Sequence, residues 1–168
     1  QLPGISFGTA NIAGMYKSVS NEQAADVLQG AWDAGIRYFD TAPHYGHGSS
    51  ERRVGDFLRG KNADEWILST KVGRILKPSA TIHNEISGFT DPLNFDQHFD
   101  FSYDGIMRSV EDSFQRLGLN RIDILFVHDL GDIGHGSNKQ EYYDQFEGSG
   151  HKALSELKCQ GVIKAIGL

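Results

Sequence analysis

The sequence is poor in cysteine, in clustered positive charge and in long apolar runs. Its one cysteine, Cys159, excludes an internal disulfide and favours a reducing compartment such as the cytoplasm. The 16 Lys and Arg residues are outnumbered by 22 Asp and Glu residues and form no basic cluster, so we expect no nucleic-acid partner. No apolar run approaches the ~18 residues of a membrane-spanning helix, so we expect no membrane segment. The residues after Gln1 show no charged and then apolar leader, so we also expect no signal peptide.

Apolar runs alternate with amphipathic helical patterns along the chain, as in repeated βα units. The predicted strands cover residues 5–10, 36–41, 66–72, 122–127 and 162–168. The predicted helices begin near Ser20, Ser49 or Ser50, Ser102 and Ser149, and they end near Gly35, Gly60, Gly118 and Gln160. Ser20, with Gln23 three residues later, forms a capping-box pattern. Each helix is expected to bury one apolar stripe, in chain order Ala24, Val27, Leu28 and Ala31; Val54, Phe57 and Leu58; Ile106, Met107, Val110, Phe114 and Leu117; and Ala153, Leu154 and Leu157.

Five strands that alternate with four helices can form a doubly wound open sheet or a (β/α) barrel. No G-x-G-x-x-G motif follows a predicted strand, which disfavours the doubly wound alternative. Polar residues instead gather where strands end, around Thr9 and at Asp40, Lys71 and His128. Barrel enzymes build their sites at these carboxyl ends. The sequence therefore predicts one α/β domain over residues 1–168, an incomplete barrel of the (β/α)8 TIM-barrel class.

The predicted barrel has two further features. A complete barrel takes ~250 residues, whereas this sequence ends in its fifth predicted strand. We therefore expect unpaired backbone at the first and last strands, through which the isolated chain could associate. The connections at 73–101 and 129–148 exceed the usual ~12–15 residues, and both follow strands. We expect loops on the active face there, although plain surface loops are the alternative.

Three segments occur in a fixed order on successive predicted strands. Residues 39–46 read Phe-Asp-Thr-Ala-Pro-His-Tyr-Gly, residues 69–73 read Ser-Thr-Lys-Val-Gly, and residues 121–129 end in Val-His-Asp. Together they resemble the signatures of the aldo-keto reductase family, and the resemblance covers residues 4–168. It implies the first half of a TIM barrel and an NAD(P)-dependent oxidoreductase.

Three other segments resemble one branch of that family. They are residues 71–74, 101–105 and 108–119. The branch contains aldose 1-dehydrogenases, L-fucose and L-galactose dehydrogenases and pyridoxal 4-dehydrogenase. The resemblance therefore implies oxidation of the C1 hydroxyl of an aldose to a lactone, or turnover of a related small alcohol or aldehyde.

By the same resemblance, the catalytic residues are Asp40, Tyr45, Lys71 and His128. Removing a hydride from a carbinol carbon requires a base for the hydroxyl proton. A free phenol has a pKa near ~10, but an ammonium ~4 Å away at an effective dielectric of ~20 stabilises the phenolate by about 4 kcal/mol. Lys71 is thus expected to activate Tyr45, Asp40 to orient Lys71, and His128 to hydrogen-bond the substrate oxygen.

The resemblance also implies a dinucleotide cofactor, either NADP or NAD. The residues expected to reach its nicotinamide ribose are Gly8, Thr9, Ala10 and Asp40. In the family most of the remaining contacts come from the second half of the barrel. We therefore expect the 168-residue chain alone to bind dinucleotide weakly and to be inactive.

Two alternatives compete with a dehydrogenase. His44 and His47 bracket Tyr45 and, with Glu51, could suggest a metal site, but their spacing matches no known ligand pattern, so we expect no metal. A non-catalytic regulatory or binding subunit with the same fold is the other alternative.

Overall fold

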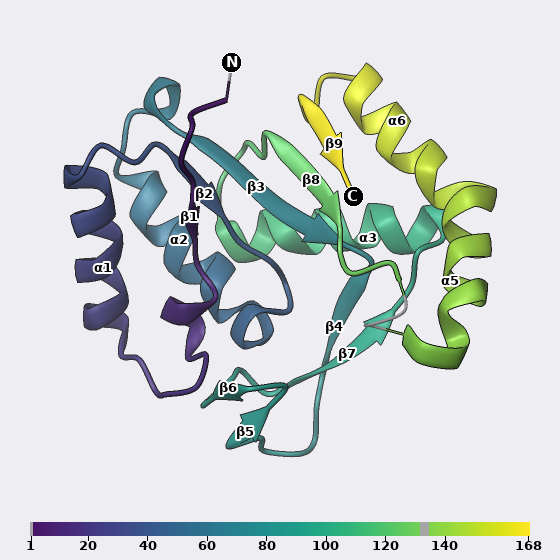
Figure 1. Cartoon of the computed structure of the whole chain (residues 1–168), viewed down its shortest axis with the longest axis horizontal. Helices are drawn as coiled ribbons and strands as arrows, with labels where there is room; N and C mark the ends of the chain where they lie inside the picture. The colour runs from purple at the N-terminus through teal and green to yellow at the C-terminus, as the bar shows by residue number, and fades with distance from the viewer. Residues whose placement is uncertain (1, 132–134) are drawn as a thin grey trace.

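A parallel sheet of five strands forms the centre of the molecule, a computed structural model that describes residues 2–131 and 135–168 (Figure 1). The strands lie in the order β1 (Phe7–Gly8), β2 (Tyr38–Asp40), β3 (Ile67–Val72), β8 (Ile124–Val127) and β9 (Ala165–Gly167). Consecutive strands are neighbours throughout, as in a barrel wall, whereas the strand order of a doubly wound sheet reverses at its switch point. The predicted partial barrel is confirmed, with shorter strands than the sequence indicated.

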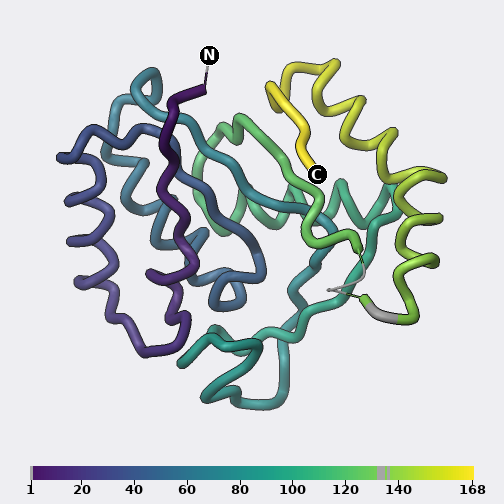
Figure 2. Tube along the Cα trace, in the orientation of Figure 1, coloured from purple at the N-terminus to yellow at the C-terminus, as the bar shows by residue number. Residues whose placement is uncertain are grey.

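Helices cover one side of the curved sheet (Figures 1 and 2). They are α1 (Asn21–Asp33), α2 (Ser49–Arg59), α3 (Tyr103–Leu117) and α6 (His151–Cys159). Alternate strand residues point toward them, because successive side chains of a strand face opposite sides. The resulting core joins both layers and includes the fully buried Leu28, Val54, Ile106 and Leu154 from the helices and Phe39, Leu68 and Leu125 from the strands.

The helix ends partly follow the sequence signals. Ser20 and Gln23 form the predicted capping box of α1, and the Ser102 hydroxyl accepts from the Gly105 amide at the start of α3. α2 begins at Ser49, as predicted, but its N-cap is Gly48 at φ 96° rather than a serine, and Ser50 lies inside the helix. The buried Ser50 hydroxyl is hydrogen-bonded to Thr9 and Thr41, which follow β1 and β2.

One residue of the predicted core was also misplaced. Val27 is 46% exposed, although its spacing matched the buried stripe of α1. The contact face of α1 is centred on Ala24, Leu28 and Ala31, so a residue one position before Leu28 lies at its solvent edge.

The 73–101 segment folds into two antiparallel pairs. β4 (Arg74–Pro78) pairs with β7 (Phe95–Phe99), and β5 (Glu85–Ile86) pairs with β6 (Phe89–Thr90). Both pairs lie beyond the carboxyl ends of β2 and β3 in Figure 1. A bridge from Met15 to Phe89 ties them to the loop after β1, which contains the short helix η1 (Asn11–Ala13). This segment therefore covers the strand ends with regular structure.

The 129–148 segment contains helix where a loop was expected. After η4 (Gly136–Asn138), α5 (Lys139–Gln145) continues through a π-helical turn (Phe146–Gly150) into α6. The predicted helix from about Ser149 to Gln160 corresponds to α6, whereas the sequence missed α5, because α5 buries none of its residues and offers no apolar stripe. The other short helices among the described residues are η2 (Tyr45–Gly48) and η3 (Ala63–Glu65).

Two features concern the molecular surface. Within the described residues, β1 pairs with β2 alone and β9 with β8 alone, so both outer strands have an unpaired side. No helix in residues 2–131 and 135–168 combines the length and hydropathy that a bilayer span requires.

Candidate active site

A partly buried ion pair joins the carboxyl end of β2 to β3. Lys71 Nζ donates to Asp40 Oδ2 at 2.6 Å and to the Thr41 carbonyl at 2.9 Å. The Ser69 hydroxyl donates to Asp40 Oδ1 at 2.6 Å. The Lys71 and Asp40 side chains are 14% and 23% exposed, respectively. The parallel register of β2 and β3 thus fixes the lysine ammonium with both carboxylate oxygens occupied.

Tyr45 lies beside this ion pair in η2, just after β2. Its ring centroid is 4.8 Å from Lys71 Nζ. It is also 6.0 Å from the ring centroid of His128, with the two planes at 89°. The structure therefore brings Asp40, Tyr45, Lys71 and His128 together, as the sequence predicted.

His128 follows β8 and is 5% exposed. Its Nδ1 is buried and makes no hydrogen bond within the described residues, while Nε2 is 3.5 Å from Asp129 Oδ2. Burial lowers the pKa of His128 to about 2, and the charges of Arg74 and Lys71 contribute. The imidazole is therefore neutral at neutral pH and suited to hydrogen bonding rather than to carrying charge.

Gln97 on β7 connects several side chains around this cluster. Its amide is 3.0 Å from His44 Nδ1 and 2.7 Å from His47 Nε2, and its oxygen accepts from Arg74 Nη1 at 3.2 Å. Arg74 in turn donates to Asp129 Oδ2 at 2.5 Å. Sequence reasoning missed Gln97 because its partners lie 53, 50 and 23 positions away. Arg74 belongs to the segment 71–74, which resembles the dehydrogenase branch of the family, but the sequence predicted no role for its side chain.

The residues predicted to contact a cofactor differ in how accessible they are to a ligand. Gly8 has open space beside it, since a Cβ there would meet no atom within 4 Å. Thr9 is fully buried, and its hydroxyl is bound to the Asp40 carbonyl at 2.8 Å and to Ser50 at 2.6 Å. Ala10 is half-buried next to η1. The Thr9 hydroxyl is therefore already used in hydrogen bonds that join the strand ends to α2.

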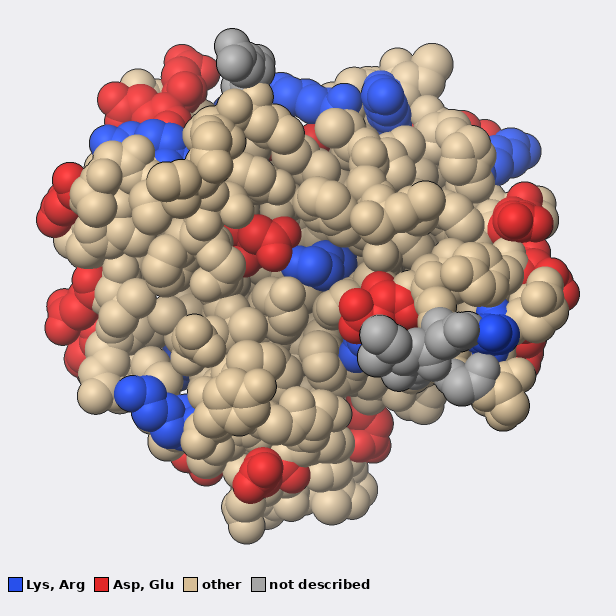
Figure 3. Space-filling view, in the orientation of Figure 1, with Lys and Arg blue, Asp and Glu red and all other residues tan. Residues whose placement is uncertain are grey.

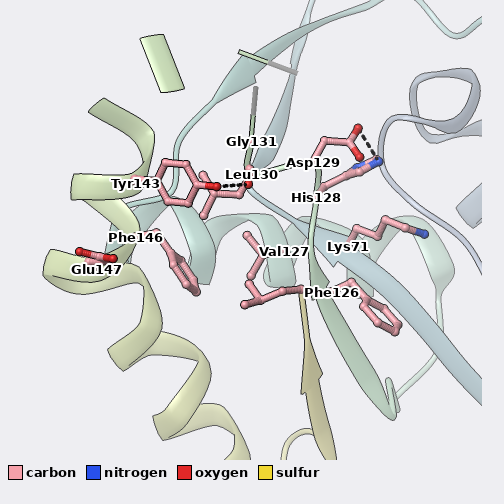
Figure 4. A pocket seen from close by; sticks show the side chains of 11 residues that line it. Lys71, Phe126, Val127, His128, Asp129, Leu130, Gly131, Tyr143, Phe146 and Glu147 are labelled. Carbon is pink, nitrogen blue, oxygen red and sulfur yellow. Dashed lines mark hydrogen bonds and ion pairs between the residues drawn. The ribbon is translucent and has the colours of Figure 1, made fainter. Parts of the chain in front are cut away.

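A pocket of about 740 Å³ opens beside Lys71 (Figure 4). Phe126 and His128 from the end of β8 form one part of its wall, and Tyr143 and Phe146 form another. The Tyr143 hydroxyl donates to the Leu130 carbonyl at 3.0 Å, as the dashed line in Figure 4 shows. The 129–148 segment thus contributes to the site wall.

Charge is sparse on this face of the molecule. In Figure 3 most blue and red side chains lie around the rim, with a neighbouring blue and red pair near the centre. Of the charged residues that line the pocket, Lys71 is paired with Asp40 and Asp129 with Arg74, and the exposed Glu147 adds a negative charge. The described part of the pocket therefore suits neutral, hydroxyl-bearing or aromatic groups better than anionic ones.

The residues weighed as a metal site do not converge. Glu51 points into the helix layer, where it accepts from Arg116 Nε at 2.5 Å and from the Thr70 hydroxyl at 2.7 Å. His44 and His47 have ring centroids 6.4 Å apart and are joined through Gln97. Residues 2–131 and 135–168 contain no cluster of three metal-ligating side chains.

A parallel βα wall with a polar cluster at its carboxyl ends defines the barrel-enzyme class of site. More narrowly, the chain belongs to the aldo/keto reductase family, whose model matches residues 4–168. It is 44% identical to pyridoxal 4-dehydrogenase from Microbacterium luteolum, covering 99% of this chain and 52% of the relative. It is 40% identical to D-threo-aldose 1-dehydrogenase from a Pseudomonas species, covering 99% of this chain and 50% of the relative.

The structure is similar to solved aldo-keto reductases. A structure from Pseudomonas aeruginosa assigned to this family aligns with a TM-score of 0.68 and 34% identity, covering 97% of this chain and 53% of that one. The chain thus spans about half the length of the proteins it matches.

Proposed function

We propose that this protein is an NAD(P)-dependent oxidoreductase that oxidises the C1 hydroxyl of an aldose to a lactone or acts on a related small alcohol or aldehyde. The convergence of Asp40, Tyr45, Lys71 and His128 at the strand ends carries this proposal. Similarity to aldose and pyridoxal dehydrogenases supports the substrate class. The exposed, unpaired Cys159 is compatible with a cytoplasmic location.

Tyr45 is proposed to exchange the proton at the substrate oxygen. The phenolate accepts the hydroxyl proton while the carbon loses a hydride, so a carbonyl forms from the alcohol. The Lys71 ammonium, 4.8 Å from the ring centroid, stabilises the phenolate, and Asp40 keeps the ammonium in place. Neutral His128 hydrogen-bonds the same oxygen. In the reverse direction Tyr45 returns the proton to a reduced carbonyl.

The described residues fit the nicotinamide end of a dinucleotide. Open space at Gly8 and the carboxylate of Asp40 lie at the edge where the ribose would bind, and Lys71 and His128 border the pocket. When bound, the nucleotide supplies the hydride acceptor. The choice between NAD and NADP depends on groups that would contact the adenosine ribose, which these residues do not include.

The proposed proton exchange is tested with Tyr45→Phe in the full-length protein. This change removes the phenol oxygen and keeps the ring, so we expect kcat to fall by a factor of ~10²–10⁴ or more while the cofactor Kd stays nearly unchanged. Steady-state kinetics with aldoses and pyridoxal, and fluorescence titration with NAD and NADP, provide the measurements.

Tyr16→Phe is the matched control, because Tyr16 is 82% exposed. It should retain wild-type kinetics. Wild-type rates in Tyr45→Phe would contradict the proposed role. Cofactor binding by the wild type without turnover of any substrate tested would instead support a regulatory subunit.

A further inference from the structure

His44 lies within the catalytic cluster, although the proposed proton transfer does not use it. Its ring centroid is 5.6 Å from that of His128 and 6.3 Å from that of Tyr45. The Phe89 ring meets it edge to face at 5.3 Å, with an interplanar angle of 90°. The 73–101 segment, which supplies Phe89, thus holds this imidazole against the place where the reacting oxygen would lie.

The His44 ring is also held by a hydrogen-bond network on one side. The backbone carbonyl of Phe95 can only accept, so His47 Nδ1 donates to it at 2.6 Å, and neutral His47 has Nε2 as an acceptor. The Gln97 amide nitrogen therefore donates to His47 Nε2 at 2.7 Å, which leaves the Gln97 oxygen to accept from Arg74. This chain of donors and acceptors orients the Gln97 amide.

The oriented amide engages only one nitrogen of His44. Its oxygen is 3.0 Å from His44 Nδ1 and its nitrogen is 2.8 Å away, so either tautomer of the imidazole can bind Gln97. Nε2 makes no hydrogen bond within the described residues and is not sealed from solvent. Burial lowers the pKa of His44 to about 4, and the Arg74 charge adds to the effect. The ring is therefore neutral, with one nitrogen fixed and the other available.

We propose that His44 Nε2 binds a second hydroxyl of the substrate, on the carbon next to the reacting carbon, and so selects hydroxyl-bearing substrates. Gln97 is the positioning residue for this contact. A hydroxyl both donates and accepts, so it can bind His44 in either tautomer. This inference rests on the proposed function, because Tyr45 and His128 define where the reacting oxygen lies.

The test compares L-fucose with 2-deoxy-L-fucose, which lacks the adjacent hydroxyl, in the full-length wild type and variants. We expect the wild type to prefer L-fucose in kcat/KM by about tenfold or more, because the deoxy sugar leaves a partly buried imidazole nitrogen without a partner. His44→Phe keeps a ring and should reduce the ratio of the two kcat/KM values toward one, mainly through KM for L-fucose. His44→Gln should restore part of the ratio.

Two further variants separate positioning from general structural damage. Gln97→Leu should lower the sugar-preference ratio, whereas His98→Phe, on the exposed side of β7, should leave it at the wild-type value. In ¹⁵N-edited NMR spectra of the wild type, L-fucose should shift the His44 Nε2 resonance and 2-deoxy-L-fucose should shift it less.

The outcomes distinguish this inference from the proposed function. An unchanged sugar-preference ratio in folded His44→Phe, with turnover intact, overturns the role of His44 alone. Absence of turnover of aldoses and pyridoxal by the wild type overturns the proposed function. A wild type that turns over both sugars equally well also overturns the selection by His44.

Discussion

At the residue scale, the imidazoles of His44 and His128 are neutral in the folded protein. Burial is the main cause of the lowered pKa values, to about 4 for His44 and about 2 for His128. An unfolded histidine has a pKa near ~6.5, so below that pH the unfolded chain binds more protons than the folded protein does. Their stabilising contribution is complete above pH ~6.5 and is lost as the pH falls toward the folded values.

We therefore expect the free energy of unfolding to fall between pH 7 and pH 4.5. Each of these two histidines can contribute at most ~1.4 kcal/mol per pH unit, less where solvent screens the charge. Urea denaturation of His44→Gln and His128→Asn at several pH values should show a shallower pH dependence than the wild type. Exposed His98→Gln serves as the control and should keep the wild-type slope. An equal slope in all four proteins would refute neutral burial of His44 and His128.

At the element scale, the close packing of α2 against α3 depends on a glycine. A Cβ at Gly55 would lie 1.9 Å from the Leu117 carbonyl oxygen, at the end of α3. By contrast, Gly30 on the exposed side of α1 has no atom within 4 Å of its Cβ position. Replacing glycine by alanine at both positions therefore separates the effect of helix packing on stability from the effect of helix propensity.

Gly55→Ala is expected to lower the free energy of unfolding by about 1–3 kcal/mol, because backbone atoms must move apart. Gly30→Ala, its matched control, should raise that free energy by up to ~1 kcal/mol through helix propensity. Thermal and urea unfolding of both variants measure the two effects. Stabilisation by both changes would show that α2 and α3 are farther apart than the structure indicates.

At the scale of the whole molecule, the described residues that line the pocket include no lysine or arginine without an ionic partner for a pyrophosphate to displace. Lys71, which lines the pocket, is bound to Asp40 at 2.6 Å. We expect the 168-residue chain to bind NAD and NADP more weakly than micromolar. Nicotinamide mononucleotide should bind about as weakly as NAD, because the adenosine half gains no charged contact.

Isothermal titration of the chain with all three nucleotides measures this difference. Micromolar binding of NAD or NADP by the 168-residue chain would show that its residues contact the phosphates after all. It would also contradict our expectation that most of the cofactor site lies outside them.

Local patterns in the sequence determined the order of strands and helices, the capping of α1 and α3, and the placement of Asp40, Lys71 and His128 at strand ends, whereas the family resemblance singled out Tyr45. Strand ends in a parallel sheet necessarily meet at one edge, so their polar residues could be placed together without a structure. The exposure of Val27 required the tertiary structure, because a helix face is defined by what packs against it. So did the Gln97 link to His44, since contacts across 53 positions depend on how β4 and β7 fold over the strand ends, and no local periodicity encodes that arrangement.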